Sequence, residues 1–447
     1  MTEFRALQLA RVPDLLAVHR ANPQFWPYLL RSEVVSAKLG RWSLLLHQRG
    51  ELIQAERNPV EAAAFIASLR ERIPPLQPPD PELPELPFLG GWFVYLGYEL
   101  AGAIEQRLNL PPAEDGLPLA LAARCPGAIV VDHARSTAWL AAESKPLIEE
   151  LQTALADVAE DQSPSRSNAT LPPLRVEADP GEDFKRGVER IGEWIVSGDV
   201  FQVNLSRGWR AEAPDPLCPV NVYQALARSN PAPFAGLARL PGGTVVSSSP
   251  ERLVGASGDQ VHTRPIAGTR PRGAGLAADR GLKGELIANA KERAEHIMLI
   301  DLERNDLGRV CTPGSVEVDE LMVVESYAHV HHIVSNVRGR LRPGIAPVDV
   351  MGAVFPGGTI TGCPKVRCME IIAELEGRGR SVYTGSMGYV GLNGVMDMNI
   401  LIRTMLVQDN QLSFRTGAGI VADSRPDAEL AETEAKARGL LKALGAA

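Results

Sequence analysis

The sequence predicts a mixed α/β (α+β) fold, in which amphipathic helices alternate with short and largely antiparallel strands. Apolar residues recur at helical spacing in several segments, for example over 183–197. Between residues 233 and 264, short strand-like runs are separated by glycine or proline. The chain has 447 residues, with 41 glycines and 35 prolines, so turns should be plentiful and a sizeable core can form.

The first 158 residues are expected to form an N-terminal region of mixed structure. The pattern predicts a helix over 58–73, a strand and turn followed by a strand or helix start over 88–100, and a hairpin over 127–141. Residues 159–175 are polar, rich in proline and serine and without periodicity. They predict a linker or surface loop before a second region, 176–447.

The second region contains more predicted helices and strands, and the candidate functional residues lie on or between them. Helices are expected over 183–197, 282–304 and 364–376, and a last helix is expected from Ser424 with Pro426 in its first turn. Strands are expected over 233–240, 243–249, 252–256, 260–264, 382–391, 395–407 and 411–415.

Composition excludes several classes of protein. The net charge of −8 argues against a nucleic-acid binder, which usually carries a basic footprint. The longest apolar stretch, Pro87 to Tyr98, is too short to span a membrane, and the N-terminus lacks the apolar core of a signal peptide. Five cysteines without a CxxC pair favour neither a disulfide framework nor a zinc site. We therefore expect a cytoplasmic protein.

Acidic residues on two predicted helices are candidate ligands of a hard cation. Glu292 and Glu295 are three residues apart, and Glu429, Glu432 and Lys436 form one stripe on the last helix. Carboxylates from two helices can hold Mg²⁺, which prefers oxygen ligands. By spacing alone, two solvated helix faces are the commoner explanation.

Two glycine-rich loops precede predicted helices, and each has backbone N–H groups that can receive an anion. They are Phe355–Lys365 and Thr416–Gly419, and neither matches a nucleotide P-loop, so plain turns remain the alternative. Arg403 lies in the apolar run MNILIRTML, where a guanidinium needs a carboxylate from the protein or from a substrate.

An ordered series of motifs resembles the chorismate-utilising enzyme family. The motifs are GDVFQVNLS, SSSPERL, TRPIAGTRPRG, AEHIMLIDLERNDLGR, HHIVSNV, FPGGTITGCPKVRCMEII, GSMGYV, MDMNILIRT and GAGIVADS. The resemblance is strong over 183–444 and weaker before residue 150. It implies two antiparallel β-sheets packed face to face, helices outside and a site in a cleft.

The resemblance also implies roles for individual residues. Glu295 and Glu432 correspond to the Mg²⁺ ligands, and Glu251 to the acid that protonates the departing C4 hydroxyl of chorismate. Arg403 and the backbone of Gly417, Ala418 and Gly419 correspond to groups that bind the enolpyruvyl carboxylate. The remaining positions implied to contact substrate are Lys436, near the ring carboxylate, and His332, Thr361 and Tyr389.

The residue at position 202 indicates which nucleophile the resemblance implies. Family members that add water to chorismate have a lysine base at this position, and glutamine cannot deprotonate water. Gln202 therefore resembles the members that use ammonia. The chain lacks the G-x-C-x-G setting of an amidotransferase nucleophile, so a separate glutamine amidotransferase subunit is expected to supply the ammonia.

Two ammonia-dependent products remain. Asn204, Arg252, the His331–His332 pair and Gly358 resemble the members that form 4-amino-4-deoxychorismate, which leads to 4-aminobenzoate and folate. The alternative is anthranilate with loss of pyruvate, and a non-catalytic chorismate or tryptophan sensor is disfavoured because the acidic and cationic residues are intact. Segments 28–32 and 41–43 faintly resemble a tryptophan site, although a plain strand pair is favoured.

One residue departs from the C4-aminating pattern. Those members often carry a nucleophilic lysine in PIKGT, whereas this chain has Ala267 in PIAGT. Alanine cannot form a covalent adduct. The resemblance then implies that ammonia itself takes the place of the lysine at C2.

Overall fold

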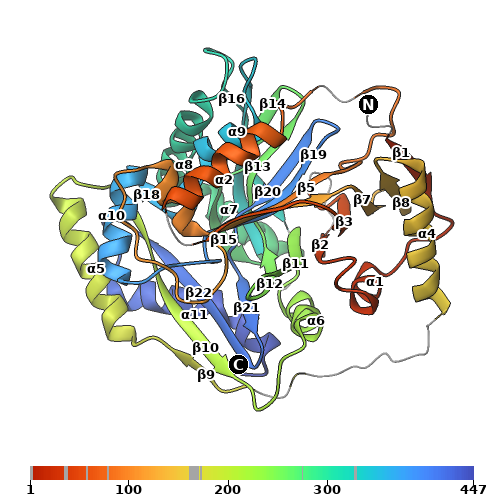
Figure 1. Ribbon diagram of the computed structural model, residues 1–447. Helices are drawn as coiled ribbons and strands as arrows, with labels where there is room; N and C mark the ends of the chain where they lie inside the picture. The colour runs from red at the N-terminus through yellow and green to blue at the C-terminus, as the bar shows by residue number, and fades with distance from the viewer. Residues whose placement is uncertain are drawn as a thin grey trace.

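Two antiparallel sheets lie face to face at the centre of the molecule, and helices cover their outer faces (Figure 1). The computed structural model describes residues 4–34, 39–56, 59–77, 80–160, 171, 174–273, 275–326 and 330–446. The predicted fold class is confirmed. Within the described helices, none is long and apolar enough to cross a membrane.

In the described residues the first sheet has twelve strands. In sheet order they are β1 (Arg5–Gln8), β8 (Thr137–Ala142), β7 (Gly127–Asp132), β3 (Trp42–His47), β2 (Tyr28–Arg31), β11 (Phe234–Leu240), β12 (Gly243–Ser249), β21 (Thr404–Gln408), β22 (Gln411–Ile420), β10 (Gln202–Glu212) and β18 (Gly362–Cys363), with β9 (Val176–Ala178) paired to β10. The strand pair expected for segments 28–32 and 41–43 is confirmed, because β2 and β3 are neighbours in this sheet.

The second sheet has ten strands in the same described ranges. They are β15 (Ile266–Pro271), β17 (Val330–Arg340), β14 (Gln260–Thr263), β13 (Arg252–Ser257), β20 (Val395–Asn399), β19 (Ser386–Gly391), β5 (Gly91–Leu96), β6 (Ala120–Cys125) and β4 (Leu52–Ala55), with β16 (Glu317–Ser326) paired to β17. Strands from before and after the expected linker are thus neighbours in both sheets, as β2 with β11 and β5 with β19. The division at 159–175 stays a prediction, since most of that segment lies outside the described residues.

Helices pack on the outer faces through apolar stripes. The first sheet contacts α1 (Leu15–Ala21), α4 (Lys145–Glu160), α6 (Pro219–Ser229) and α11 (Pro426–Ala443), while α5 (Gly181–Val196) and α10 (Lys365–Glu376) pack on β10. On the second sheet lie α2 (Pro59–Arg72), α3 (Ala101–Ile104), α7 (Leu276–Ala288), α8 (Ala290–Gly308) and α9 (Pro347–Val354).

The facing sides of the two sheets form a shared core. The rings of Tyr28 on β2 and Phe93 on β5 stack with their centroids 3.9 Å apart. Leu46 and Tyr95 are also fully buried in this layer. Each such residue alternates with one that faces the helices, so the period-two pattern sets which side chains lie between the sheets.

Several predicted elements are confirmed and others are corrected, among them the loop expected at Thr416–Gly419, which is part of strand β22. The helices over 183–197 and 364–376, the hairpin over 127–141 and the helix over 59–73 are present, while residue 58 lies outside the described ranges. The single helix expected over 282–304 is two helices, α7 and α8, separated at Asn289, whose ψ of 106° is extended. The last helix begins at Pro426, and Ser424 instead accepts a hydrogen bond from the backbone N–H of Val421.

The strand expected over 395–407 is also wrong. The chain leaves the second sheet after Asn399 and enters the first sheet at Thr404. The intervening residues, 400–403, form a crossover between sheets rather than a strand. Its first three residues, 400–402, are apolar because they pack into the cores on either side, which is why the run resembled one continuous strand.

Candidate active site

Two crossovers between the sheets meet at the centre of the site. Glu251 lies between β12 of the first sheet and β13 of the second, and Arg403 lies between β20 and β21. The backbone N–H of Ile400 donates to the carbonyl of Glu251 at 3.0 Å, and that of Ser248 donates to the carbonyl of Arg403 at 3.1 Å. The Ser249 hydroxyl donates to the Ile400 carbonyl at 2.5 Å. The two crossovers therefore hold each other in place.

Arg403 presents its guanidinium without a fixed protein partner. Its φ of 52° is unusual for a residue with a side chain, and marks a backbone held by its surroundings. Within the described residues, no hydrogen bond or ion pair engages the guanidinium. Burial lowers the pKa of Arg403, while Tyr383 and Glu432 act in the opposite direction. Its donors can therefore receive a substrate carboxylate.

Lys436 connects α11 to the glycine-rich strand β22. Its ammonium donates to the carbonyl of Gly417 at 2.9 Å and pairs with Glu432 at 2.7 Å. Both side chains stay partly exposed, at 35% and 47% respectively. Glu432 thus stands within electrostatic reach of two cations, Lys436 and Arg403.

Glu251 has the environment of a proton donor. Its side chain is buried, and burial raises its pKa to about 7, although the Thr359 hydroxyl and the Lys436 ammonium counter this rise. A carboxyl group with a pKa near neutrality exists in both protonation states at neutral pH. The group is therefore able to donate a proton.

Gln202 and Asn204 line the glycines of β22. A Cβ on Gly419 would lie 2.5 Å from Gln202 Nε2, and one on Gly417 would lie 2.9 Å from Asn204 Oδ1. Both side chains are buried, and Gln202 Oε1 and Asn204 Oδ1 make no hydrogen bond within the described residues. Buried polar atoms in this condition indicate a site for a ligand or water. Ala418, between the glycines, is fully buried.

His332 and Ala267 come from neighbouring strands of the second sheet. His332 Nδ1 lies 3.4 Å from the carbonyl of Gly268, and burial lowers the pKa of His332 to about 4, so the ring is neutral. Arg403 contributes to this lowering, which places His332 within electrostatic reach of Arg403. Ala267 is half-buried beside a bulge in β15 and offers only a methyl group.

Thr361 and Tyr389 occupy structural positions. Thr361 is fully buried, its hydroxyl donates to the carbonyl of Gly357 at 2.9 Å, and its own carbonyl accepts from the backbone of Asn204 at 2.9 Å. Tyr389 lies in the layer between the sheets, edge-on to Phe88 with centroids 5.7 Å apart. Their contact with substrate stays a prediction.

The two expected magnesium ligands, Glu295 and Glu432, lie on helices α8 and α11. Glu295 is half-buried on α8, one turn after Glu292, whose carboxylate approaches Gly268. Within the described ranges, no group of three or more metal-ligating side chains is found. Mg²⁺ commonly takes only one or two protein carboxylates and completes its shell with water and substrate oxygens. Glu295 and Glu432 are carboxylates of the type that Mg²⁺ accepts, and their joint binding of the ion stays a prediction.

The sequence patterns did not single out a buried charged cluster of Lys365, Asp306 and Glu303 within electrostatic reach of Glu251. Lys365 pairs with Asp306 at 2.5 Å and also donates to the carbonyl of Val354 at 3.1 Å. Burial raises the pKa of Glu303, and nearby Asp306 raises it further. Glu251 adds to the same effect, so Glu303 and Glu251 are within electrostatic reach. The i, i+3 spacing of Glu303 and Asp306 does not by itself distinguish a buried pair from a solvated helix face.

Comparison with known proteins identifies the class. A model of the chorismate binding enzyme family matches residues 32–442. Anthranilate synthase component 1 of Streptomyces coelicolor is 41% identical over 98% of this chain and 91% of its own length. Aminodeoxychorismate synthase component 1 of Bacillus subtilis is 50% identical over 59% of this chain and 56% of its own.

A comparison with solved structures indicates the same class of enzyme. Anthranilate synthase component I from Streptococcus pneumoniae superposes with a TM-score of 0.79 at 30% identity, over 91% of this chain and 94% of that one. The chain belongs to the chorismate binding enzyme family. It is an enzyme that acts on chorismate, as the sequence motifs predicted.

Proposed function

We propose that the chain is component I of aminodeoxychorismate synthase, a cytoplasmic enzyme that converts chorismate and ammonia to 4-amino-4-deoxychorismate. The supporting observation is the chemistry of two buried side chains, Glu251 and Gln202. The buried Glu251 carboxyl, with its pKa near 7, can protonate a leaving hydroxyl. Gln202 cannot act as a base, so a nucleophile that needs no deprotonation is favoured.

The proposed reaction has two displacements. Ammonia adds at C2 of chorismate, the ring double bonds shift, and the C4 hydroxyl leaves as water after taking a proton from Glu251. A second ammonia then adds at C4, and the first leaves from C2. Ala267 has no amine to form the adduct that a lysine would form, so both nitrogens come from ammonia.

The chain's own residues orient chorismate for these steps. In this proposal Arg403 and the N–H groups at 417–419 bind the enolpyruvyl carboxylate, and Lys436, which donates to the carbonyl of Gly417, contacts the ring carboxylate. Mg²⁺, when held by Glu295 and Glu432, would neutralise the ring carboxylate. His332 is neutral, so it can accept or donate a hydrogen bond without adding charge.

The ammonia is proposed to come from a glutamine amidotransferase subunit. The names of the relatives support this, because each is a numbered component of a synthase. The chain shows no amidotransferase nucleophile motif. Free ammonium should replace the partner in a purified assay.

Anthranilate synthase component I is the second candidate. Ala267 favours it, because C4 amination in this family often uses a lysine at that position. The full-length relative from Streptomyces coelicolor carries that name as well. In this alternative the intermediate aminated at C2 loses pyruvate instead of receiving a second ammonia.

A product assay separates the two candidates. The purified chain is mixed with chorismate, Mg²⁺ and ammonium, and aminodeoxychorismate lyase is added to half. We expect 4-aminobenzoate only with the lyase. Fluorescent anthranilate without the lyase would refute C4 amination and support the alternative.

The role of Ala267 has its own test. An Ala267→Lys variant incubated with chorismate and Mg²⁺, but no ammonia, should gain the mass of a covalent adduct. Wild type under the same conditions is the control. An unmodified mass for the variant would contradict the proposed position of Ala267 against C2.

The metal assignment is tested by a matched pair of variants. Glu432→Gln removes one proposed ligand charge, and Glu434→Gln removes a charge two residues away that reaches only Arg207, at 3.8 Å. We expect the first to raise the Mg²⁺ concentration for half-maximal activity about tenfold or more, as for lost metal-site groups, and the second to leave it unchanged. Full turnover of Glu432→Gln at low Mg²⁺ would rule out the assignment.

A further inference from the structure

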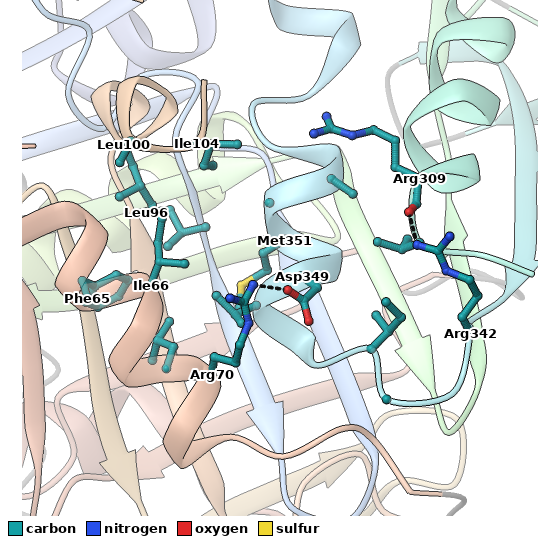
Figure 2. Close-up of a pocket in the computed structure, with 18 residues that line it drawn as sticks. Phe65, Ile66, Arg70, Leu96, Leu100, Ile104, Arg309, Arg342, Asp349 and Met351 are labelled. Atoms are coloured by element: carbon teal, nitrogen blue, oxygen red, sulfur yellow. Dashed lines mark hydrogen bonds and ion pairs between the residues drawn. The ribbon is translucent and has the colours of Figure 1, made fainter. Parts of the chain in front are cut away.

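A cavity outside the active site opens between α2, α3, α9 and the segment after α8 (Figure 2). Its volume is about 650 Å³. None of the residues assigned above to chorismate, metal or proton transfer lines it. Its size lies within the range of small-molecule sites, about 300–1,000 Å³.

The floor of the cavity is apolar and rigid. Phe65, Leu69, Leu96, Leu100 and Met351 line it, and each is at most 2% exposed. They belong to the core between the second sheet and its helices. An apolar floor of this kind accepts an aromatic or aliphatic group.

Gly352 also lines the cavity. It lies in α9, and a Cβ built on it would meet no atom within 4 Å. Glycine inside a helix costs about 0.5–1 kcal/mol relative to alanine, yet the space here would admit a side chain. The position can therefore be used to fill the cavity without removing any existing contact.

The rim carries more positive than negative charge. Arg70 pairs with Asp349, and Arg309 lies 3.6 Å from Glu105. Arg342 donates to the backbone carbonyl of Arg309 at 2.5 Å, and within the described residues no carboxylate pairs with it. Figure 2 shows Arg309 and Arg342 on the side opposite Phe65 and Ile66. The rim thus has one cation left for an anionic ligand.

We propose that this cavity binds a small amphipathic anion, with an aromatic or aliphatic body and one carboxylate or sulfonate. The body would fill the apolar floor, and the acid would meet the guanidinium of Arg342, with Arg309 beside it. Guanidinium groups bind carboxylates and other oxyanions through paired hydrogen bonds, and Arg342 is exposed at the rim, where a ligand can reach it. The proposal for this cavity does not depend on whether the enzyme makes 4-amino-4-deoxychorismate or anthranilate.

The test uses 8-anilinonaphthalene-1-sulfonate, an aromatic anion whose fluorescence rises in apolar sites. N-phenyl-1-naphthylamine is the matched neutral probe. We expect saturable binding of the anion at one site on the native protein. Gly352→Leu and Gly352→Trp should weaken it by about tenfold or more, because they occupy the floor.

A matched control uses Gly192, a helical glycine on α5 that also has no atom within 4 Å of a Cβ. Gly192→Trp should bind both probes as wild type does. Arg342→Gln should weaken the anion about fivefold to tenfold, the size expected for one charge-assisted hydrogen bond, and leave the neutral probe unchanged.

Several results would overturn the proposal. Absence of saturable binding to wild type would remove the site, and so would equal binding by wild type and both Gly352 variants with unchanged melting temperatures. Displacement of the anion by chorismate with Mg²⁺ would assign the signal to the active site instead. An equal loss of both probes in Arg342→Gln would refute the charged contact.

Discussion

Glu376 joins the strands that carry the candidate site, and replacing it should destabilise the protein by a measurable amount. Its side chain is 2% exposed and receives five hydrogen bonds. Arg380 donates to both carboxylate oxygens, at 2.6 and 3.1 Å, and Arg415 donates at 2.6 Å. The backbone N–H and hydroxyl of Ser206 donate at 2.9 and 2.8 Å. One carboxylate therefore neutralises two guanidiniums that are themselves 1% and 10% exposed.

The expected loss follows from that geometry. Glu376→Gln keeps the shape but leaves two buried cations without an anion, and removing one partner of a buried pair costs about 3–5 kcal/mol. Unfolding entropy is about 2.1 cal/mol/K per residue, so for 447 residues each kcal/mol corresponds to about 1 °C. We expect the melting temperature at pH 7 to fall by about 3–5 °C in scans at one fixed rate.

Glu374→Gln on the same helix is the control, because Glu374 is exposed. It should change stability by less than about 0.5 kcal/mol. If Glu376→Gln melts within about 1 °C of this control, the reasoning about the buried carboxylate is wrong.

The pH dependence of stability provides a second readout of the same residue. Burial alone would raise the pKa of Glu376, but Arg380 and Arg415 outweigh it and lower the pKa below the ordinary value. A carboxyl with a lowered folded-state pKa stabilises the protein above its unfolded pKa, and this contribution is lost as the pH falls through the folded value. The stability difference between wild type and Glu376→Gln should therefore be full at pH 7 and shrink below about pH 4.

Three further predictions concern the site itself. Glu251→Gln should lower kcat about 10²-fold to 10⁴-fold with an unchanged melting temperature, and a kcat within threefold of wild type would exclude Glu251 as the acid. The wild-type kcat should fall above the Glu251 pKa of about 7, because only the protonated carboxyl group donates a proton. Arg403→Lys should raise the KM for chorismate about tenfold or more, because lysine cannot bind a carboxylate through two donors, and an unchanged KM would remove Arg403 from the binding site. Gly419→Ala should raise KM through the 2.5 Å approach of its Cβ to Gln202 Nε2, whereas Gly192→Ala should not, and equal KM values would contradict that crowding.

The residues of the candidate site could be selected from the sequence because they lie in local motifs, and their roles stay predictions. Glu251, Gln202 and Lys436 were chosen from the sequence, and the structure brings them to one region through β10, β22 and α11. Gly417 and Gly419 were expected in a loop, whereas they alternate along strand β22, where they leave room on one face.

The parts that could not be predicted depend on tertiary context. Residues 400–402 are apolar and β-branched in part, so period and composition give no sign that the chain changes sheets there. Asn289 ends one helix and precedes another inside a continuous periodic run. The pairing of Lys365 with Asp306 joins positions 59 residues apart, and no local pattern indicates such a contact.

The two crossovers explain why proton donor and guanidinium meet. In the first sheet Ser247 is paired with Thr404, and in the second Arg252 is paired with Asn399. Because both ladders are antiparallel, the segments between them must run side by side, with Glu251 on one and Arg403 on the other. A slip of one residue in either ladder would turn every side chain of that strand to the opposite face. The register of two sheets therefore sets the relative position of the two groups.

The N-terminal region contributes to this arrangement without supplying a candidate residue. Its strand β2 pairs with β11, next to β12, and its strand β5 pairs with β19, next to β20. The strands that enter and leave the crossovers are interior strands with neighbours on both sides, and β2 and β5 cover β11 and β19, which would otherwise be edge strands. An edge strand can shift or fray, whereas an interior strand is held by two ladders. Positioning of reacting groups tolerates errors of only about 1 Å, so burying these strands within the sheets is itself a requirement for the chemistry.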